Sequence, residues 1–507
     1  MLKYKLLPDD TVGVMYDDLY VDNLEGVIDI PTYTTDLDEK KRLVTQILDN
    51  AFVECCKIRV VTLPSSIRHI GKCAFAKCNR LDVVNMENGI LTIGEKAFAL
   101  CNYLEKCELP DTITEIGIGA FANCENLLSI HIPELLDEIK ENTFNECCSL
   151  KEVIIGDNVK TLRMACFAKC HDLERVMLGK SLHVIEEGAF FQCVNLESVL
   201  FNDCLVELGN NCFRKCRLLN VSIPSSVKSI GEKCFADCAI LESFIIEYPS
   251  DSEDSRCSLL LGKATFAGCF KLSHVYLGYA VKKLPDDIFV SANISDIHSL
   301  LLFVSEIGEG AFMDNKTTGT LHIPDNIITI QKNAFQSCDY LTKLIIGNGL
   351  KVIPVAAFGK CPRLQEVSIS NSITKISVGA FEGCSALEEI YFPDSVKLFD
   401  GPSFKNCVNL RKVVIGNGVE VIPSNMFFKC EKLQEVAIGS SVREICTFAF
   451  SKCMSLRSIH IPHSVNIVYG AAFMNCSSLE KVDVNMEKTK IDSSAFPGCV
   501  SLFSSGP

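Results

Sequence analysis

The sequence predicts a repeat solenoid of α/β type, built mostly of β-structure, in which about twenty similar coils stack on one another. Three observations lead to this prediction. The 507 residues are too many for one ordinary globular core. A phenylalanine recurs along most of the chain at a spacing of 23 residues, and the segment after it repeats one alternation of apolar and polar positions. A fixed period of this length is typical of stacked repeats.

The phenylalanines form a ladder that starts at Phe52 and ends at Phe496. Seventeen of its nineteen intervals are 23 residues long, one is 22 and one is 31. Its members are Phe52, Phe75, Phe98, Phe121, Phe144, Phe167, Phe190, Phe213, Phe235, Phe266, Phe289, Phe312, Phe335, Phe358, Phe381, Phe404, Phe427, Phe450, Phe473 and Phe496. Complete burial of one such side chain contributes roughly 2 to 3 kcal/mol, so we expect the ladder to be a main source of stability.

Each coil is expected to contain a short strand after its phenylalanine. In the coil of Phe121, the alternation of Leu127, Ile130 and Ile132 predicts a strand, and Pro133 ends it. One strand per coil, repeated in the same direction, pairs with its copies in a parallel sheet with strands about 4.8 Å apart. The rest of the coil then returns on the other side and carries the phenylalanine into the core.

Cysteine follows the ladder phenylalanine by three residues in eighteen of the twenty coils, as Cys124 follows Phe121. Zinc binding needs ligands that converge on one point, whereas these cysteines form a line and the chain has no CxxC motif. Disulfides between stacked coils are compatible with the coil spacing, but a continuous ladder has no unique pairing. The interpretation that we favour is a small, buried, free thiol that donates a weak hydrogen bond in a turn.

The coil pattern resembles the 23-residue repeat of the BspA-type leucine-rich repeat family, whose diagnostic phrase is LxxIxIPxSVxxIGxxAFxxC. The resemblance covers residues 52–502. It implies a leucine-rich repeat solenoid, a right-handed superhelix with a parallel β-sheet on its concave face. It also implies an N-terminal β cap over residues 1–51, and it leaves residues 503–507 as a tail.

Two segments depart from the repeat. Residues 248–257, "YPSDSEDSRC", are an acidic insertion placed after a strand, so we expect a loop at one edge of the sheet. Residues 289–320 contain two degenerate coils, with Ala292 and Asn315 at the cysteine position. We expect a softer joint in the solenoid there.

The overall composition argues against nucleic acid as a partner. The formal net charge is -14, the isoelectric point is near 5.3, and no run of Lys and Arg occurs that would neutralise phosphates. No stretch of 18 uncharged apolar residues predicts a membrane span, and the first residues lack the apolar region of a signal peptide. These features make a cytoplasmic location the alternative to the cell-surface or secreted location that the resemblance implies.

No motif in the sequence predicts chemistry. The chain has no GxSxG, Walker, GxGxxG or HExxH sequence, so we expect no catalytic residue, no cofactor and no metal site. His131, His322 and His460 take the same outward position in distant coils, which prevents them from converging. The carboxylates of the acidic insertion lack the spacing and the final glutamate of a calcium loop.

The position ten residues after each phenylalanine faces outward from the sheet, and its residues form a lane along the array. This lane is mostly apolar between Ile154 and Tyr276. Exposed apolar patches usually mark contact surfaces, although β-branched residues also simply suit a strand. Our candidate ligand contacts are His131, Ile154, Met177, Leu200, Ile245 and Tyr276.

The sequence therefore predicts a non-enzymatic protein that binds another protein on its sheet. The family resemblance implies a surface adhesin or an interaction module for host, extracellular matrix or cell-surface proteins. The alternative is an intracellular scaffold or inhibitor of the cysteine-rich leucine-rich repeat type. Fold and ligand vary independently in repeat proteins, so the ligand is not specified by the repeat pattern.

Overall fold

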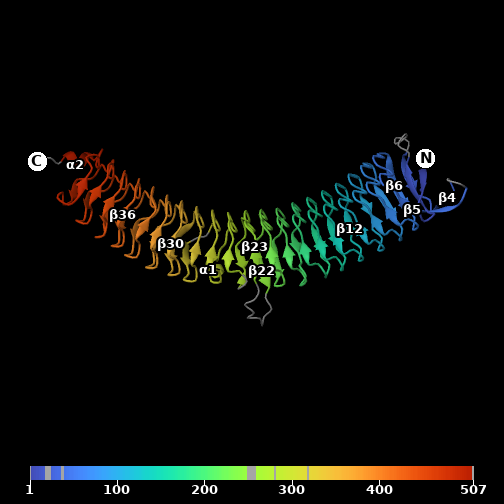
Figure 1. Cartoon of the computed structure of the whole chain (residues 1–507), viewed down its shortest axis with the longest axis horizontal. Coiled ribbons are helices and arrows are strands. Elements are labelled where there is room, and N and C mark those ends of the chain that lie inside the picture. Colours follow the sequence, from blue (N-terminus) through green and yellow to red (C-terminus); the bar gives the residue numbers. More distant parts are fainter. Residues whose placement is uncertain are drawn as a thin grey trace. The chain divides into compact units, whose positions relative to one another are not determined.

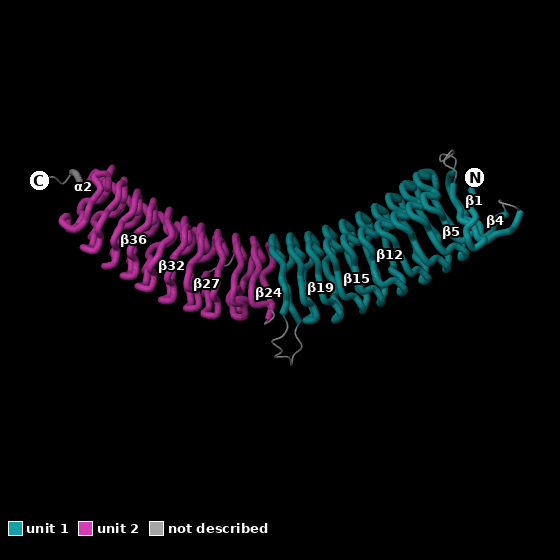
Figure 2. Tube along the Cα trace, viewed as in Figure 1, with its two compact units in different colours: residues 1–269 teal, residues 270–507 magenta. Residues whose placement is uncertain are grey.

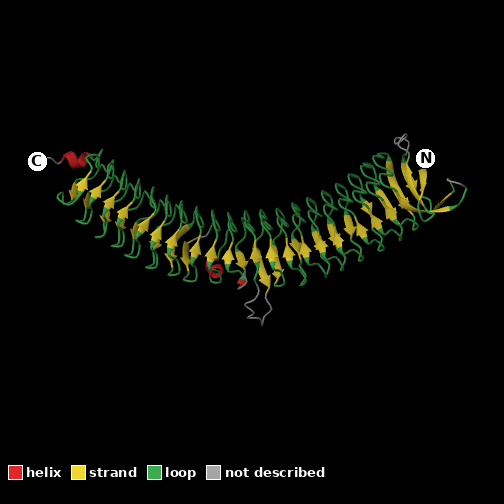
Figure 3. Ribbon diagram, in the orientation of Figure 1, coloured by secondary structure: helices red, strands yellow, loops and turns green. Residues whose placement is uncertain are grey.

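A computed structural model describes residues 2–16, 24–35, 39–247, 258–278, 281–316 and 319–504. These residues form a solenoid of short parallel strands with very little helix, which confirms the predicted fold class (Figure 3). The chain divides into two compact units, residues 1–269 and 270–507 (Figure 2). The insertion at residues 248–257 lies outside the described residues.

Most coils contribute two strands, where the sequence predicts one. We call the strand that follows the ladder phenylalanine the major strand, and the two-residue strand that precedes the next phenylalanine the minor strand. The major strands of the first unit are β6 (Ile58–Leu63), β8 (Val83–Met86), β10 (Lys106–Cys107), β12 (Ser129–His131), β14 (Glu152–Ile154), β16 (Arg175–Met177), β18 (Ser198–Val199), β20 (Asn220–Pro224) and β22 (Ser243–Glu247). Its minor strands are β7 (His69–Ile70), β9 (Thr92–Ile93), β11 (Glu115–Ile116), β13 (Glu138–Ile139), β15 (Thr161–Leu162), β17 (Val184–Ile185), β19 (Glu207–Leu208), β21 (Ser229–Ile230) and β23 (Leu260–Leu261).

Most strands of one kind pair in parallel with the same strand of the next coil, so that equivalent residues lie side by side (Figure 1). On the major strands Ile130 pairs with Val153, and Val153 pairs with Val176. On the minor strands Ile139 pairs with Leu162. A period of 23 residues therefore places each residue beside its own copies in both rows of strands.

The second unit repeats this arrangement. Its major strands are β24 (His274–Tyr276), β27 (Gly319–Ile323), β29 (Leu341–Ile346), β31 (Glu366–Ser368), β33 (Glu389–Tyr391), β35 (Lys412–Val414), β37 (Glu435–Ala437), β39 (Ser458–His460) and β41 (Lys481–Asp483). Its minor strands are β25 (Lys283–Leu284), β26 (Glu306–Ile307), β28 (Thr329–Ile330), β30 (Val352–Ile353), β32 (Lys375–Ile376), β34 (Leu398–Phe399), β36 (Val421–Ile422), β38 (Glu444–Ile445), β40 (Ile467–Val468) and β42 (Lys490–Ile491). A short helix, α2 (Val500–Ser504), follows the last ladder position.

A short helix, α1 (Ile297–Leu301), replaces the major strand in the degenerate coil after Phe289. Asp296 caps this helix, because its carboxylate accepts a hydrogen bond from the backbone N–H of Ser299 at 3.0 Å. The apolar residues Ile297, Leu300 and Leu301 have helical spacing, and all three are buried. The coil that lost the strand pattern thus buries its apolar residues through a turn of helix.

The first residues of the chain contribute β1 (Leu2–Leu6), β2 (Val12–Tyr16), β3 (Gly26–Asp29), β4 (Tyr33–Thr34) and β5 (Arg42–Ile47). β1 pairs with β2 in an antiparallel hairpin, and β2 pairs in parallel with β5, which pairs with β7. β3 pairs in parallel with β6. These strands extend both rows at the start of the solenoid, and their residues Val44 and Ile47 are fully buried.

The ladder phenylalanines stack in the core between the two rows of strands. In the first unit, consecutive rings from Phe52 to Phe266 have centroids 5.0 to 5.8 Å apart and planes within 12° of parallel. In the second unit, the rings from Phe289 to Phe496 are 5.0 to 6.0 Å apart. Phe121 has no exposed surface, and Leu127, Ile130 and Ile132 of the same coil are also buried. The core is therefore a continuous aromatic stack within each unit.

The turn that carries the phenylalanine is hydrogen-bonded to the turn of the next coil. The backbone N–H of Phe75 donates to the carbonyl of Ala97 at 2.7 Å, and that of Lys77 donates to Ala99 at 2.8 Å. The residues two before and two after the phenylalanine take left-handed backbone angles, as in Cys73 with φ of 53° and Lys77 with φ of 62°. This conformation costs a residue other than glycine about 1 to 2 kcal/mol.

The variant Leu100→Gly is expected to be about 0.5 to 1 kcal/mol more stable than Leu100→Ala, because both lose the leucine side chain and only glycine removes the backbone strain. Leu100 has φ of 62° and a partly exposed side chain, and glycine takes the equivalent place at Gly383. Removal of the backbone strain outweighs the greater chain entropy of glycine, about 0.5 to 1 kcal/mol. Urea unfolding measures the change. Leu100→Ala is the control, since alanine keeps the strain; equal stability of both variants would contradict the explanation.

Candidate binding surface

The major strands of the first unit present an outward face, which we call the major face. The middle residue of each three-residue strand points into the core, as in the buried Val153 and Val176, and the residues on either side point outward. The outward residue ten positions after each phenylalanine belongs to the candidate lane. Met177 is 58% exposed, Leu200 is 87% exposed and Ile245 is 42% exposed. Large apolar side chains therefore lie open to solvent along this face.

The structure brings some candidate residues together and separates others. His131, Ile154 and Met177 are neighbours in register on β12, β14 and β16, and Ile154 is half-buried between its partners. Leu200 directly follows β18, and Ile245 on β22 pairs with Ser222 on β20. Tyr276 belongs to β24 of the second unit and is 47% exposed there. A role of these residues in ligand binding stays a prediction.

The cysteine ladder is a chain of thiol hydrogen bonds in the core. The thiol of Cys124 donates to the carbonyl of Phe98 in the preceding coil at 3.3 Å, and the thiol of Cys147 donates to Phe121 at 3.3 Å. Seventeen of the eighteen ladder cysteines make this bond, at 3.1 to 3.4 Å. All eighteen are buried, and each cysteine of the described residues is free.

Most of these carbonyls accept two hydrogen bonds. The carbonyl of Phe121 accepts one from the backbone N–H of Cys124 at 3.2 Å and one from the thiol of Cys147. A carbonyl oxygen has two lone pairs, so the turn uses one and the next coil uses the other. Cysteine suits this place because its side chain is small and apolar enough for the core and still carries a weak donor.

Burial keeps most of the ladder thiols protonated. It raises the pKa of Cys101, Cys238 and Cys407 to about 12 in each case. The thiolate is the reactive form of cysteine, so these side chains have a structural place rather than the environment of a nucleophile. Cys56 and Cys204 are the exposed cysteines among the described residues.

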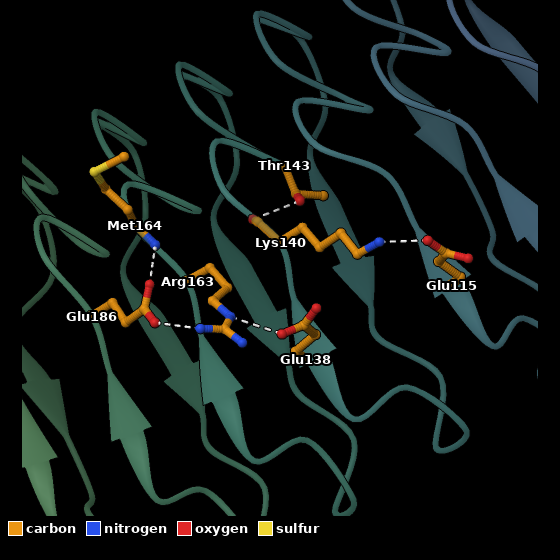
Figure 4. A network of polar contacts seen from close by, with 7 residues as sticks. All are labelled: Glu115, Glu138, Lys140, Thr143, Arg163, Met164 and Glu186. Carbon is orange, nitrogen blue, oxygen red and sulfur yellow. Dashed lines mark hydrogen bonds and ion pairs between the residues drawn. The ribbon is translucent and has the colours of Figure 1, made fainter.

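Charged side chains link neighbouring coils beside the minor strands (Figure 4). The guanidinium of Arg163 contacts Glu138 on one side and Glu186 on the other, both at 2.7 Å. These two carboxylates, Glu138 first, raise the pKa of Arg163 above its ordinary value. Lys140 pairs with Glu115 in the same row. The network joins the coils at the surface as the thiols join them in the core.

Two grooves lie beside this network, and the sequence pattern does not reveal them. One has a volume of about 490 Å³. It is lined by Glu141, Met164, Glu186, Glu187, Glu207, Leu208, Gly209, Asn210, Ser229 and Gly231. The second, of about 340 Å³, lies along the turns near Phe191 and Asn211. In the first groove Gly209 takes the coil position that Arg163 and Glu186 occupy in the two preceding coils, a difference that the repeat pattern averages out.

The histidines do not form a common site. His131, His322 and His460 lie on β12, β27 and β39, and His460 contacts Asp483 at 2.8 Å. His298 on α1 packs against His322 with ring centroids 5.6 Å apart. The repeat pattern, which predicts a strand in this coil, does not indicate this contact. Across the described ranges, no three metal-ligating side chains are placed to hold one ion. The same ranges contain no helix with the length and apolar character of a membrane span.

Solved leucine-rich repeat structures resemble this chain. A leucine-rich repeat protein from Bacteroides ovatus is 27% identical, with 78% of this chain and 94% of that chain covered and a TM-score of 0.60. A leucine-rich repeat protein from T. pallidum is 28% identical over 39% of this chain and 89% of its own, with a TM-score of 0.36. A leucine-rich cell surface protein from Faecalibacterium prausnitzii is 21% identical over 86% of this chain and 93% of its own, with a TM-score of 0.32.

A family model described as the BspA type leucine-rich repeat region matches most of the sequence. The matched segments are residues 45–174, 160–295, 298–411 and 399–505. No curated protein sequence matches the chain. The family matches span the same coils as the phenylalanine and cysteine ladders, and they confirm the resemblance found in the repeat pattern. The chain belongs to the BspA-type leucine-rich repeat family.

Proposed function

We propose that the major face of the first unit is the binding site for a protein ligand. The observation that carries the proposal is the exposure of Met177 and Leu200, at 58% and 87%, on a regular row of strands. Neither side chain contributes to the core, and a row of large exposed apolar side chains is a feature of contact surfaces. Leucine-rich repeats are a protein-interaction fold, which agrees with this assignment.

The ligand that we propose is a protein of another cell or of an extracellular matrix, and the chain would then act as a surface adhesin without catalysis. Family membership supports this location, because BspA-type repeats are typically associated with bacterial surfaces. The major face is also the face that the sequence predicts to be concave. An elongated row of strands offers a ligand many neighbouring contacts of the same kind, which suits adhesion to a large protein.

Simultaneous replacement of Met177, Leu200 and Ile245 by lysine is expected to reduce ligand affinity at least tenfold. Each lysine brings a charge that the ligand would bury without a compensating partner, and the apolar contacts of the original side chains are lost. The wild-type chain and the triple variant are immobilised separately and exposed to solubilised surface proteins. Each protein that is captured is then purified, and its affinity for both chains is measured by biolayer interferometry.

The matched control is Ile328→Lys with Leu398→Lys and Val421→Lys, three exposed apolar positions of the second unit. Circular dichroism must be the same for all three proteins. Equal affinity of the purified ligand for the wild type and the major-face variant would remove the proposal.

The free thiols favour a second candidate, an intracellular scaffold or inhibitor that binds a protein with the same face. All described cysteines are free, including the exposed Cys56 and Cys204, and unpaired cysteines persist in reducing compartments. Labelling of intact cells with a membrane-impermeant reagent distinguishes the two candidates. A labelled chain supports the adhesin, and labelling only after lysis supports the intracellular scaffold.

A further inference from the structure

The two units differ strongly in charge. Residues 1–269 contain 41 acidic and 27 basic residues, whereas residues 270–507 contain 22 of each. The first unit therefore carries the full net charge of -14, and the second unit is neutral by the same count. An excess of one sign on one part of a protein attracts partners of the opposite sign.

Part of this acidic charge lies in two columns of residues that flank the ends of the major strands. The first column is seven residues after the ladder phenylalanine, before the apolar lane, and its carboxylates are Asp82, Glu105, Glu174, Glu197 and Glu242. The second is thirteen residues after the phenylalanine, beyond the lane, and its carboxylates are Asp111, Glu134, Asp157 and Asp203. Arg59, Lys151 and Lys180 are the cations in these columns. The lane thus has a predominantly acidic column on each side.

Several cations of this face already have partners within it. Lys180 pairs with Asp157, and Arg175 lies 3.7 Å from Glu152. The carboxylates of Glu174 and Asp203 are exposed, and neither has a salt bridge with any residue that the structure describes. Unpaired acidic groups therefore flank Met177 and Leu200 on the two sides of the lane.

We propose that the ligand segment bound by the major face is cationic and amphipathic. Its aliphatic or aromatic side chains contact Met177, Leu200 and Ile245, and its Lys and Arg side chains reach the two acidic columns. Each column lies three residues from the lane along the chain, outside the ends of the major strands, so its backbone is at most about 10 Å from the lane, within reach of a long basic side chain on the bound segment. This inference rests on the proposed function, because it describes the ligand of the same surface.

Selection from a displayed library of random dodecapeptides, with the intact chain as bait, tests this inference. We expect the enriched peptides to combine two or more Lys or Arg residues with aliphatic or aromatic residues. We also expect the affinity of an enriched peptide to fall roughly tenfold when NaCl is raised from 50 to 300 mM, since salt screens exposed charges. Enrichment of neutral or acidic peptides, or no enrichment, would overturn the inference.

Two triple variants of the full chain separate the charges from the apolar lane. Glu174→Gln with Asp203→Asn and Glu242→Gln removes charge and keeps the lane, and we expect roughly tenfold weaker peptide binding. Met177→Ser with Leu200→Ser and Ile245→Ser keeps the charge, and we expect a similar loss. The control, Glu141→Gln with Glu187→Gln and Glu207→Gln, removes three carboxylates beside the minor strands and should bind as the wild type does.

The outcomes separate this inference from the proposed function. If the serine variant loses binding and the major-face charge variant does not, the inference is wrong and the lane remains the contact surface. If the serine variant binds like the wild type, the lane is not the contact surface and the proposed function is wrong. Loss of binding in the control as well would show that only the overall charge of the first unit matters, which also overturns the inference.

Discussion

Raising the pH from 8 to 10 under reducing conditions is expected to unfold the protein cooperatively. Thirteen ladder thiols have a pKa that burial, as the first cause, raises above the ordinary value of 9.0. They are Cys78, Cys101, Cys124, Cys147, Cys170, Cys193, Cys216, Cys238, Cys269, Cys384, Cys407, Cys430 and Cys453. Each stays protonated in the folded chain at a pH at which the unfolded chain has released its proton.

The sign of the effect follows from this difference. Stability is fully present below about pH 9, where both states hold the proton. This stability is lost as the pH rises, because the thiols ionise in the unfolded state while the buried thiols of the folded state stay protonated. At one pH unit above the ordinary value, each thiol costs about 1.4 kcal/mol, and thirteen thiols cost on the order of 18 kcal/mol. The free energy of unfolding of typical domains is about 5 to 15 kcal/mol.

Urea unfolding at pH 8.0, 8.5, 9.0 and 9.5, followed by circular dichroism, measures the slope of stability against pH. Combined Cys101→Ala, Cys124→Ala and Cys147→Ala substitutions should reduce this slope by roughly a fifth, whatever they do to stability at pH 8, because burial also raises the pKa of Cys107, Cys166 and Cys212 outside the ladder. Cys204→Ser, at an exposed position, should leave the slope unchanged. A urea midpoint that stays constant to pH 9.5 would show that the buried thiols do not govern alkaline stability.

Replacement of Phe358 by alanine is expected to lower the free energy of unfolding by about 3 to 5 kcal/mol. The ring is fully buried and stacks between Phe335 at 5.4 Å and Phe381 at 5.7 Å. Its loss removes apolar contacts and leaves a cavity that the two neighbouring rings cannot fill, because each is held by its own coil. Guanidinium unfolding of the purified variant measures the effect.

Phe270 provides the matched control for this substitution. It lies in the same unit and is 54% exposed, so Phe270→Ala removes the same atoms from a site that is already partly hydrated. We expect a change of about 0.5 kcal/mol or less. A loss below about 1 kcal/mol for Phe358→Ala would mean that the coil relaxes around the gap and that the stack is not a main source of stability.

Much of the fold could be predicted because each coil repeats the same pattern of buried and exposed residues. The phenylalanine position, the strand after it and the parallel pairing follow from one period, and twenty copies remove the ambiguity of any single coil. The minor strands were not predicted, since each contains only two residues and one buried side chain, such as Ile139. Helix α1 was also missed, although the cap residue Asp296 and the spacing of Ile297, Leu300 and Leu301 signal it.

The sequence predicts which side chains of the candidate surface point outward, but it does not predict how exposed each of them is. Alternation along a strand shows which side of the sheet Met177 and Ile154 occupy. It does not show that Met177 is exposed while Ile154 is half-buried, because exposure depends on the sizes of neighbouring side chains in adjacent coils. The charge of the surrounding columns was visible in the sequence, but only the structure shows which cations are already paired within the face.

The hydrogen bonds that the ladder carbonyls accept from the next coil have a consequence for how the number of coils changes. Every thiol bond, every stacked ring pair and every strand pairing described within a unit joins a coil to its immediate neighbours. Duplication or deletion of the gene segment that encodes one 23-residue coil would therefore bring together two coils whose facing surfaces already match. Recombination can lengthen or shorten such a chain without any compensating mutation in its core, and each event adds or removes one row of the exposed face on which selection acts.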